Sequence, residues 1–182
     1  MPKKINFEEK EQKLIEYTKD TPYFTFNEQI HLAKVVYCYD GDTCHCVFKH
    51  DGDYYRFRVR MNGYDSPEMR PRKSEYPDEK DRKEIKRRAV IARDKLKDLV
   101  LNKIVILECN GEDKYGRLLG TIKLKLEDEK TVNDLMVEDG QGYIYNGGTK
   151  DQSIFTQKVK TNKSLSNKIK KIFSKNKKKI IN

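Results

Sequence analysis

The chain has 182 residues, of which 36% are hydrophobic and 37% are charged, whereas roughly 25% charged residues is typical. No apolar run approaches the roughly 18 residues that a membrane-spanning helix needs, and the residues after Met1 are polar and charged rather than a secretory signal. These features disfavour a membrane-spanning or conventionally exported protein. We therefore expect an intracellular protein, either cytoplasmic or nuclear.

The formal net charge of +10 is concentrated at the C-terminal end. Residues 150–182 contain 11 lysines and a single acid, which accounts for the whole excess. Such a Lys-rich tail is expected to contact polyanions, and its cluster at Lys175–Lys179 is also typical of a nuclear-localisation segment. We therefore expect an N-terminal extension over residues 1–30, one domain over 31–149 and a tail over 150–182.

The first half of the chain predicts a short helix and then strands. The helix is expected near residues 7–18. Residues 34–50 are rich in Val, Tyr, Cys and Phe, which is typical of strands, and Asp40–Thr43 interrupts them. Asp51-Gly52 predicts a hairpin turn. The alternation from Tyr54 to Met61 then predicts a half-buried strand, with Tyr55 on its inner face and Arg58 and Arg60 on its outer face.

The second half predicts a long helix between strands. One apolar stripe at helical spacing carries the prediction: Ile85, Ala89, Ala92, Leu96 and Leu99. Strands are expected over 103–109 and 118–126, with a turn at Asn110-Gly111. A short helix capped by Thr131 or Asn133 should end at Gly140, before a last short strand at 143–145. This order predicts an α+β, mainly β fold: a five-stranded OB-type barrel with two or three helices.

Four cysteines, Cys38, Cys44, Cys46 and Cys109, form no Cys-x-x-Cys pair. In a strand, Cys44-His45-Cys46 would direct His45 away from both thiols. This pattern favours small, half-buried strand residues over a zinc site. Reduced thiols also fit an intracellular protein.

Three polar clusters carry the candidate chemistry: Asp40-Gly41-Asp42-Thr43, Asp65-Ser66-Pro67-Glu68 and Asp113-Lys114-Tyr115-Gly116-Arg117. Taken singly, each has the composition of an ordinary turn. Together, their carboxylates and backbone carbonyls supply the oxygen ligands that a hard divalent cation prefers. Arg60 and Arg117 add guanidinium groups, which bind phosphate oxygens in a fork.

In this order and spacing the clusters resemble the staphylococcal nuclease (thermonuclease) family, from about Val36 to about Tyr145. The resemblance implies a calcium-dependent endonuclease on an OB-type barrel. Such an enzyme hydrolyses phosphodiester bonds of DNA and RNA with little sequence specificity and leaves 3′-phosphate ends. Another divalent ion in place of calcium stays possible, and we expect a monomer.

The resemblance also implies roles for individual residues, by matching position. The metal would be held by Asp42, Asp65 and the backbone carbonyl of Ser66, with Asp40 reaching it through water. The catalytic residues would be Arg60, Arg117 and Glu68, the last as general base. Substrate would be contacted by Lys114, Tyr115, Tyr143 and Tyr145.

Two other readings stay open. The first is a non-catalytic OB-fold module that binds nucleic acid. The second is an interaction protein whose acidic clusters are only turns. Glu68 together with Arg60 and Arg117 favours the nuclease over both, since a binding module needs positive charge but no carboxylate beside the scissile phosphate.

Overall fold

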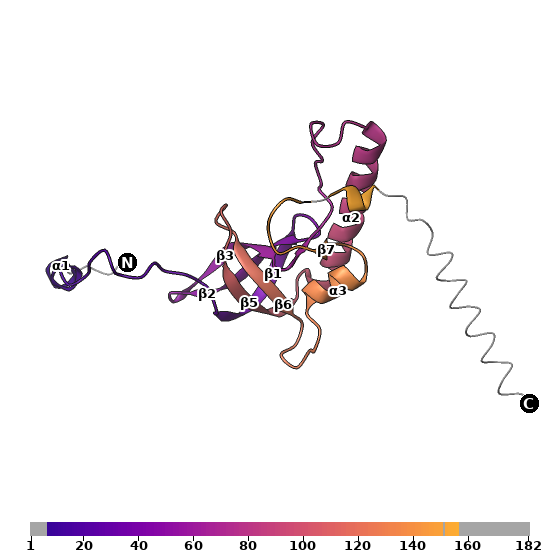
Figure 1. The fold of residues 1–182 in the computed structure, drawn as a ribbon. Coiled ribbons are helices and arrows are strands. Elements are labelled where there is room, and N and C mark those ends of the chain that lie inside the picture. Colours follow the sequence, from indigo (N-terminus) through magenta and orange to yellow (C-terminus); the bar gives the residue numbers. More distant parts are fainter. Residues whose placement is uncertain (1–6, 151, 157–182) are drawn as a thin grey trace, which may run out of the picture.

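The computed structural model describes residues 7–150 and 152–156. Its centre is a closed five-stranded barrel in the order β1-β2-β3-β6-β5 (Figure 1). Neighbouring strands are antiparallel except for the parallel pair β3 and β6. The barrel strands are β1 Ile30–Cys38, β2 Thr43–His50, β3 Asp53–Met61, β5 Ile104–Glu112 and β6 Leu118–Lys123. The predicted OB-type, mainly β architecture is confirmed.

The remaining elements lie outside the barrel. A two-stranded sheet pairs β4 (Tyr64–Asp65) with β7 (Tyr143–Ile144). The described part of the chain has three α-helices, α1 (Phe7–Leu14), α2 (Glu79–Val100) and α3 (Val132–Glu138), and a short 3-10 helix, η1 (Gln152–Phe155). In Figure 1, α2 and α3 lie on the same side of the barrel, whereas α1 lies apart from it at the end of an extended segment.

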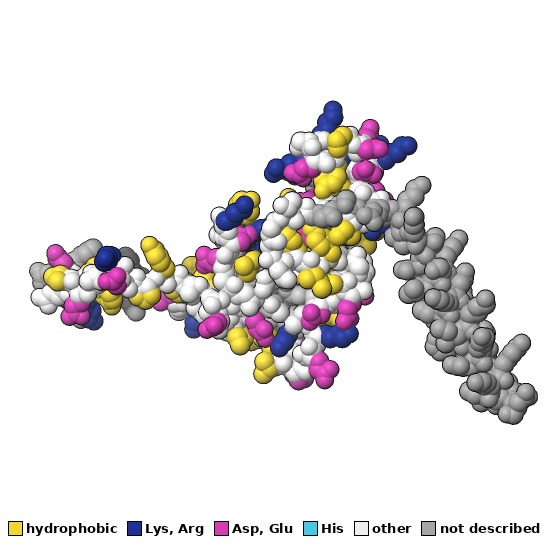
Figure 2. All heavy atoms as spheres, in the orientation of Figure 1, with side chains coloured by type: hydrophobic (Ala, Val, Ile, Leu, Met, Phe, Trp, Pro, Cys, Tyr) yellow, Lys and Arg dark blue, Asp and Glu magenta, His cyan; other side chains and the backbone are white. Residues whose placement is uncertain are grey.

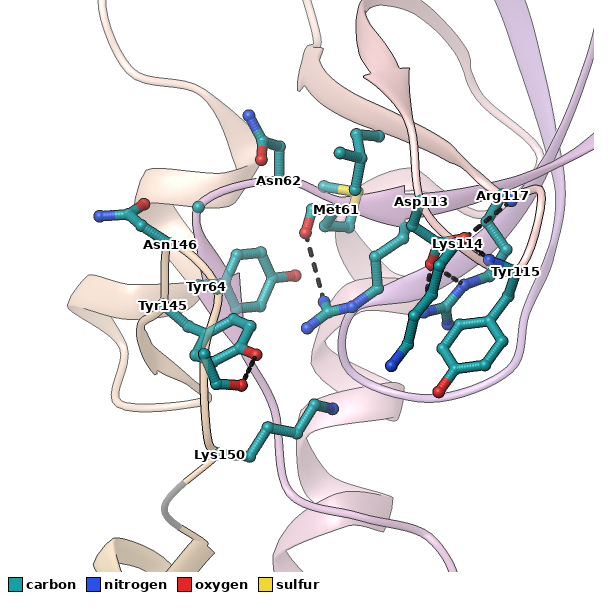
Figure 3. A pocket seen from close by; sticks show the side chains of 15 residues that line it. Met61, Asn62, Tyr64, Asp113, Lys114, Tyr115, Arg117, Tyr145, Asn146 and Lys150 are labelled. Atoms are coloured by element: carbon teal, nitrogen blue, oxygen red, sulfur yellow. Dashed lines mark hydrogen bonds and ion pairs between the residues drawn. The ribbon is translucent and has the colours of Figure 1, made fainter.

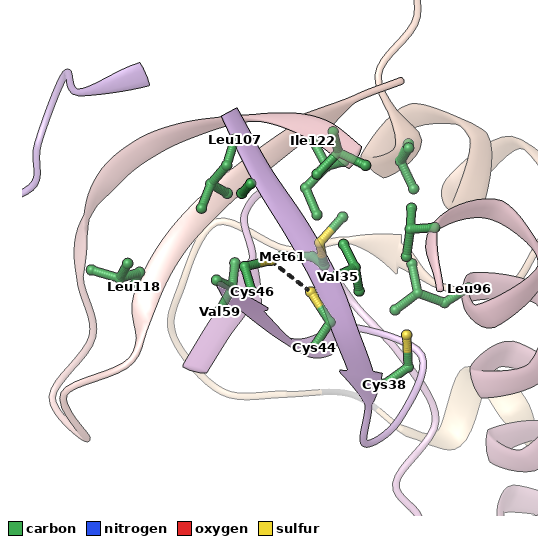
Figure 4. Close-up of a cluster of buried hydrophobic side chains, with 14 of the residues drawn as sticks. Val35, Cys38, Cys44, Cys46, Val59, Met61, Leu96, Leu107, Leu118 and Ile122 are labelled. Carbon is green, nitrogen blue, oxygen red and sulfur yellow. Dashed lines mark hydrogen bonds between the residues drawn. The ribbon is translucent and has the colours of Figure 1, made fainter. Parts of the chain in front are cut away.

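The core fills the barrel and continues under α2. Inward-facing residues of the strands, among them Val35, Cys46 and Leu107, are fully buried, and Leu96 of α2 lies against this cluster (Figure 4). At one end Phe26 closes the interior, with its ring centroid 6.0 Å from that of Phe48. The core therefore joins the barrel and α2 into one packed unit.

The predicted stripe of α2 is confirmed at four of its five positions. Ile85, Ala89, Ala92 and Leu96 are completely buried, but the fifth buried residue is Val100 rather than Leu99. At the start of this helix, side chains of both charges lie together on the surface (Figure 2). Ion pairs such as Glu79–Lys83, 2.6 Å apart, neutralise part of the basic face.

Two predictions about the strands were wrong. The dipeptide Asn110-Gly111 does not form the turn, because β5 continues to Glu112 with a shift of register after Cys109. Gly111 has a φ of 94°, which glycine adopts readily in a bulge as well as in a turn.

The strict alternation predicted for β3 also fails. Tyr55 is 50% exposed and Arg60 only 6% exposed. β3 pairs with β6 only at residues 59–61, so its first half has a free edge on that side and its end is enclosed. Arg60 is buried because β3 is paired on both sides at this end, with β2 and with β6.

All four cysteines are free, but they are fully buried rather than half-buried. The sulfur atoms of Cys44 and Cys46 lie 3.9 Å apart inside the barrel, while His45 is on the other face of β2. Burial raises the pKa of the Cys38 thiol to about 12 and that of Cys109 to about 11. The cysteines are therefore core residues and poor nucleophiles at neutral pH.

Candidate active site

The centre of the site is a buried arginine shared by two carboxylates. Arg60 lies at the end of β3, and its Nη1 is 2.9 Å from Oδ1 of Asp42 while its Nη2 is 2.8 Å from Oδ1 of Asp65. Both aspartates are buried, with exposed fractions of 4% and 0%. Burial disfavours the charged guanidinium, but the two aspartates outweigh it and raise the pKa of Arg60. The structure thus brings three of the predicted site residues together.

The turn before β2 fixes the positions of the Asp40 and Asp42 carboxylates relative to each other. The backbone N–H of Asp42 donates to Oδ1 of Asp40 over 3.0 Å, and the backbone N–H of Ser66 donates to Oδ2 of Asp42 over 2.7 Å. Burial, and after it the charge of Asp42, raises the pKa of Asp40 to about 8. Asp40 therefore lies beside the site and makes its contacts through Asp42.

Gly41 allows this turn to approach α2 closely. A Cβ atom at Gly41 would lie 2.7 Å from that of Ala92 and 2.9 Å from that of Ser66, which is closer than carbon atoms pack. The Gly41 carbonyl also accepts a 2.7 Å hydrogen bond from the buried hydroxyl of Tyr64. The Asp-Gly-Asp spacing is therefore a steric requirement of the fold as well as a source of carboxylates.

Two residues that sequence reasoning missed complete the site. Gln152, in η1, is only 3% exposed. Its side-chain amide donates to Oδ2 of Asp65 over 2.6 Å and to the carbonyl of Ser66 over 3.0 Å, and its Oε1 accepts a 3.0 Å hydrogen bond from the backbone N–H of Glu68. Gln152 is not part of any of the three clusters, so no local pattern could have identified it.

Lys150 bridges two of the predicted acids. Its Nζ lies 2.7 Å from Oδ1 of Asp65 and 3.2 Å from Oε1 of Glu68. Partial burial disfavours its charge, but the hydrogen bond and charge of Asp65, followed by the charge of Glu68, raise the pKa of Lys150. The sequence predicts a tail from residue 150 onward, but Lys150, Gln152 and Phe155 pack against the domain, so the packed part of the chain extends into that segment.

Arg117 is held next to the cluster by its own hairpin. Its Nε and Nη2 each lie 2.7 Å from Oδ2 of Asp113, and its Nη1 donates to Oγ1 of Thr43 over 3.4 Å. Thr43 in turn donates to Oδ1 of Asp42 over 3.0 Å. Arg117 therefore reaches the buried carboxylates through one intervening hydroxyl, and not directly.

A pocket of about 540 Å³ opens beside this cluster. Figure 3 shows Lys114, Tyr115 and Arg117 on one side of it and Tyr145 and Lys150 on the other. Its lining also includes Arg60. Four cationic side chains thus surround a space in which Asp113, already paired with Arg117, is the only acid among the lining residues that the structure describes. The pocket is suited to an anion.

The two predicted stacking tyrosines have different positions. Tyr145 lines the pocket, and its hydroxyl donates to the carbonyl of Gly148 over 2.6 Å. Tyr143 is not among the lining residues, and its hydroxyl donates to Oδ2 of Asp65 over 3.4 Å. Tyr145 is thus the one of the pair that is placed to meet a ligand in the pocket.

The donor atoms around Asp65 fit a hard cation. Asp42, Asp65 and the Ser66 carbonyl offer oxygen atoms, and the buried Oγ of Ser66 has no hydrogen-bond partner within the described residues. Lys150 and Gln152 already contact these oxygens, so an ion held there must replace some of their contacts. No group of three or more Asp, Glu, His or Cys side chains in the described ranges forms a metal cluster by itself.

A closed mixed barrel with an acid–arginine cluster at one end and a cation-lined pocket beside it defines an OB-type protein of the α+β class. Residues 58–173 match the family described as staphylococcal nuclease homologue, and the chain belongs to that family. Membership indicates a nuclease or a nucleic-acid-binding protein.

The matched residues include Arg60, Asp65, Glu68 and Arg117, while Asp42 precedes them. The resemblance seen in the sequence runs from about residue 36 to about residue 145. The family match begins later, at residue 58, and ends later, at residue 173, within the tail. No curated protein is similar enough to the chain to count as a match. Within residues 7–150 and 152–156, no helix has the length and apolar character needed to cross a membrane.

Proposed function

We propose that the protein is a calcium-dependent endonuclease that hydrolyses phosphodiester bonds of DNA and RNA with little sequence specificity, leaving 3′-phosphate ends. The observation that carries the proposal is Arg60 between Asp42 and Asp65, at distances of 2.9 and 2.8 Å, on the wall of a cationic pocket. The three carboxylates of Asp42, Asp65 and Glu68 exceed by one the two cations that contact them, Arg60 and Lys150, and this excess negative charge favours a further cation.

The arginines would bind and stabilise the phosphate. A guanidinium group presents a fork of N–H donors to phosphate oxygens, and Arg60 and Arg117 both line the pocket. Hydrogen-bond donors that are already held in place lower the barrier most when they face the phosphate oxygens on which negative charge increases in the transition state. A bound calcium ion, held by Asp42, Asp65 and the Ser66 carbonyl with Asp40 behind them, would supply further positive charge.

Glu68 would act as the general base. Its side chain is 41% exposed and is tied to Asp65 through Lys150, so water can reach it. It would accept the proton of the attacking water while the new bond to phosphorus forms and the bond to the 5′ oxygen breaks. Its Oε1 is paired with Lys150, so this role requires Lys150 to yield that contact.

A non-catalytic nucleic-acid-binding module is the second candidate, and the same lysine favours it. The ammonium group of Lys150 lies within 3.2 Å of both Asp65 and Glu68, so these acids have a partner without any metal. In that case the cations of the pocket would bind phosphate and no bond would be broken.

The experiment that tests the proposal uses the full chain with plasmid, single-stranded DNA and RNA, each with calcium, magnesium or a chelator. We expect cleavage with calcium, none with the chelator, and ends from which a phosphatase releases phosphate. Glu68→Gln should retain oligonucleotide affinity and lose roughly 10²- to 10⁴-fold in turnover.

Glu75→Gln is the matched control, because this glutamate of the 66–78 loop is exposed and paired with Arg72. Equal turnover of the Glu68→Gln protein and the wild type would remove the assigned base. Tight binding without cleavage under every metal condition would establish the binding module instead.

A further inference from the structure

Two cations hold the acid cluster, and they differ in their freedom to move. The Arg60 side chain is 8% exposed and contacts Asp42 and Asp65 at once. The Lys150 side chain is 40% exposed and contacts Asp65 and Glu68 from the surface. A lysine ammonium is a compact charge on a flexible four-carbon stem, whereas a buried guanidinium fork is fixed by its partners. Of these two cations, Lys150 is therefore the one that can exchange partners.

The chain is anchored both before and after Lys150. Before it, the Tyr145 hydroxyl donates to the Gly148 carbonyl over 2.6 Å. After it, the buried Gln152 donates to Asp65 over 2.6 Å. Exposed side chains change rotamer within nanoseconds, far faster than segments of the main chain rearrange. An exchange of partners at this position therefore requires only a rotation of the Lys150 side chain.

The pocket offers Lys150 a second anionic partner whenever a phosphate group occupies it. Lys150 is one of the four cationic residues that line the pocket. Figure 3 shows its side chain extending into that space, with Lys114 and Arg117 on the opposite side. A phosphate held between these groups brings acceptor oxygens to an ammonium that has three hydrogens to donate. The phosphate therefore competes with the carboxylates of Asp65 and Glu68 for the same cation.

Release of Lys150 would free two groups of the proposed mechanism at once. Its Nζ lies 2.7 Å from Oδ1 of Asp65, a proposed metal ligand, and 3.2 Å from Oε1 of Glu68, the proposed general base. At such distances the ammonium group repels any cation that approaches Asp65. It also occupies the Glu68 oxygen that would accept a proton from water. One rotation of one side chain therefore opens both the metal site and the base.

We propose that Lys150 is a gate that phosphate opens. Its ammonium group blocks Asp65 and Glu68 in the free protein and moves to the phosphate of a ligand in the pocket, which opens the site to calcium. The calcium step rests on the proposed function, whereas the exchange of Lys150 between carboxylate and phosphate does not. Because coupling between two ligands is reciprocal, the phosphate ligand raises calcium affinity and calcium raises the affinity for that ligand by the same factor.

The test must separate the gate from the direct attraction between calcium and phosphate, which couples the two ligands even without Lys150. Calcium is titrated calorimetrically into the full chain, with and without saturating adenosine 5′-monophosphate (AMP), a monoester with no diester bond to cleave. AMP is also titrated into the same proteins in a chelator. The proteins are the wild type, Lys150→Ala and a control variant.

In the wild type, AMP should raise calcium affinity through both the direct attraction and the opened gate. In Lys150→Ala the increase caused by AMP should be about tenfold smaller, because no ammonium group competes with calcium for Asp65 before AMP binds. In the chelator, Lys150→Ala should bind AMP about threefold or more weakly than the wild type, since a hydrogen bond to the phosphate is lost.

Lys114→Ala is the matched control, because it removes the same charge from the same pocket, and Lys114 forms no ion pair with another described residue. It should weaken AMP binding but keep the wild-type increase in calcium affinity. Equal increases in Lys150→Ala and the wild type, or an unchanged AMP affinity of Lys150→Ala in the chelator, would overturn the gate. Absence of calcium binding in all three proteins would instead overturn the proposed function, and the chelator measurement would then decide whether Lys150 exchanges partners.

Discussion

Gln152 donates a 2.6 Å hydrogen bond to Asp65, although the two residues are 87 positions apart in the chain. Both side chains are buried, and the same amide group also contacts the Ser66 carbonyl and the Glu68 backbone. One glutamine therefore fixes the whole segment that carries three of the predicted site residues.

Gln152→Ala should destabilise the protein and disorganise the site. The substitution removes the partner of the Ser66 carbonyl and of the partly buried Glu68 N–H, and one of several partners of Asp65; an unsatisfied buried group costs about 1–3 kcal/mol. We expect the free energy of unfolding, measured in urea, to fall by at least that amount. We also expect a lower affinity for calcium, measured by calorimetry. Gln141→Ala is the control, because among the described residues the hydrogen bond of this side-chain amide goes to the nearby Asp139 carbonyl. Equal stability of the two variants would contradict the positioning role.

Arg60→Ala and Arg117→Ala should separate the effect of a buried ion pair from that of a half-buried one. Both arginines are predicted to bind phosphate, so both variants should lose turnover. Their effects on stability should differ, because the Arg60 side chain is 8% exposed and that of Arg117 is 25% exposed. Removing Arg60 leaves the buried Asp42 carboxylate without a cationic partner and Asp65 with Lys150 alone, which costs about 3–5 kcal/mol, whereas removing Arg117 should cost about 1 kcal/mol or less.

Urea unfolding of both variants at neutral pH measures this contrast. Arg60→Lys refines it, since lysine keeps the charge but cannot reach two carboxylates as a fork. We expect its stability to lie between those of wild type and Arg60→Ala. If Arg60→Ala were as stable as Arg117→Ala, the buried cluster would contribute little to the fold.

Much of the fold follows from local patterns in the sequence. The apolar stripe from Ile85 to Leu96 and the cap of α3 are set by residues close together in the chain, so their signals are local. Thr131 caps α3 in a reciprocal box with Asp134. Asn133, the alternative cap, instead bridges the barrel, because its side chain accepts from the Ile122 N–H and donates to the Asn62 carbonyl. Only tertiary packing decides between these two uses.

The candidate site could be predicted only in part for the same reason. Asp42, Asp65 and Arg60 lie at strand ends, and strand pairing brings them together. Gln152 and Lys150 reach the site from a segment whose composition resembles the tail, and no periodicity links them to Asp65. Their contacts depend on where β7 and η1 return the chain, which the order of local elements does not specify.

Lys150→Ala should strengthen calcium binding. The lysine ammonium group lies 2.7 Å from Asp65, where it competes with any cation held by that carboxylate. Like charges about 4 Å apart repel by several kcal/mol at a protein surface, so we expect calcium affinity to rise roughly tenfold or more. Calorimetric titration with calcium alone measures this, and Lys125→Ala serves as the control. Weaker calcium binding together with lower stability would show that Lys150 is a permanent partner of Asp65.

Two truncations should separate the packed end of the domain from the Lys-rich segment that follows it. A chain ending at Thr156 keeps Lys150, Gln152 and Phe155, the last of which is 3% exposed with its ring centroid 5.8 Å from that of Tyr143. A chain ending at Gly148 loses all three. Both should show a smaller salt dependence of DNA binding, because both lose ten or more lysines of the tail.

Only the shorter chain should also lose stability, by about 3 kcal/mol or more, because a buried aromatic ring and the hydrogen bonds of Gln152 are removed together. Urea unfolding and turnover on a dinucleotide, which is too short to reach the tail, measure the two effects separately. Equal stability and turnover of the two truncated proteins would place the functional end of the domain before Lys150. A loss of turnover in the chain ending at Thr156, with its stability intact, would instead make the Lys-rich segment part of the site.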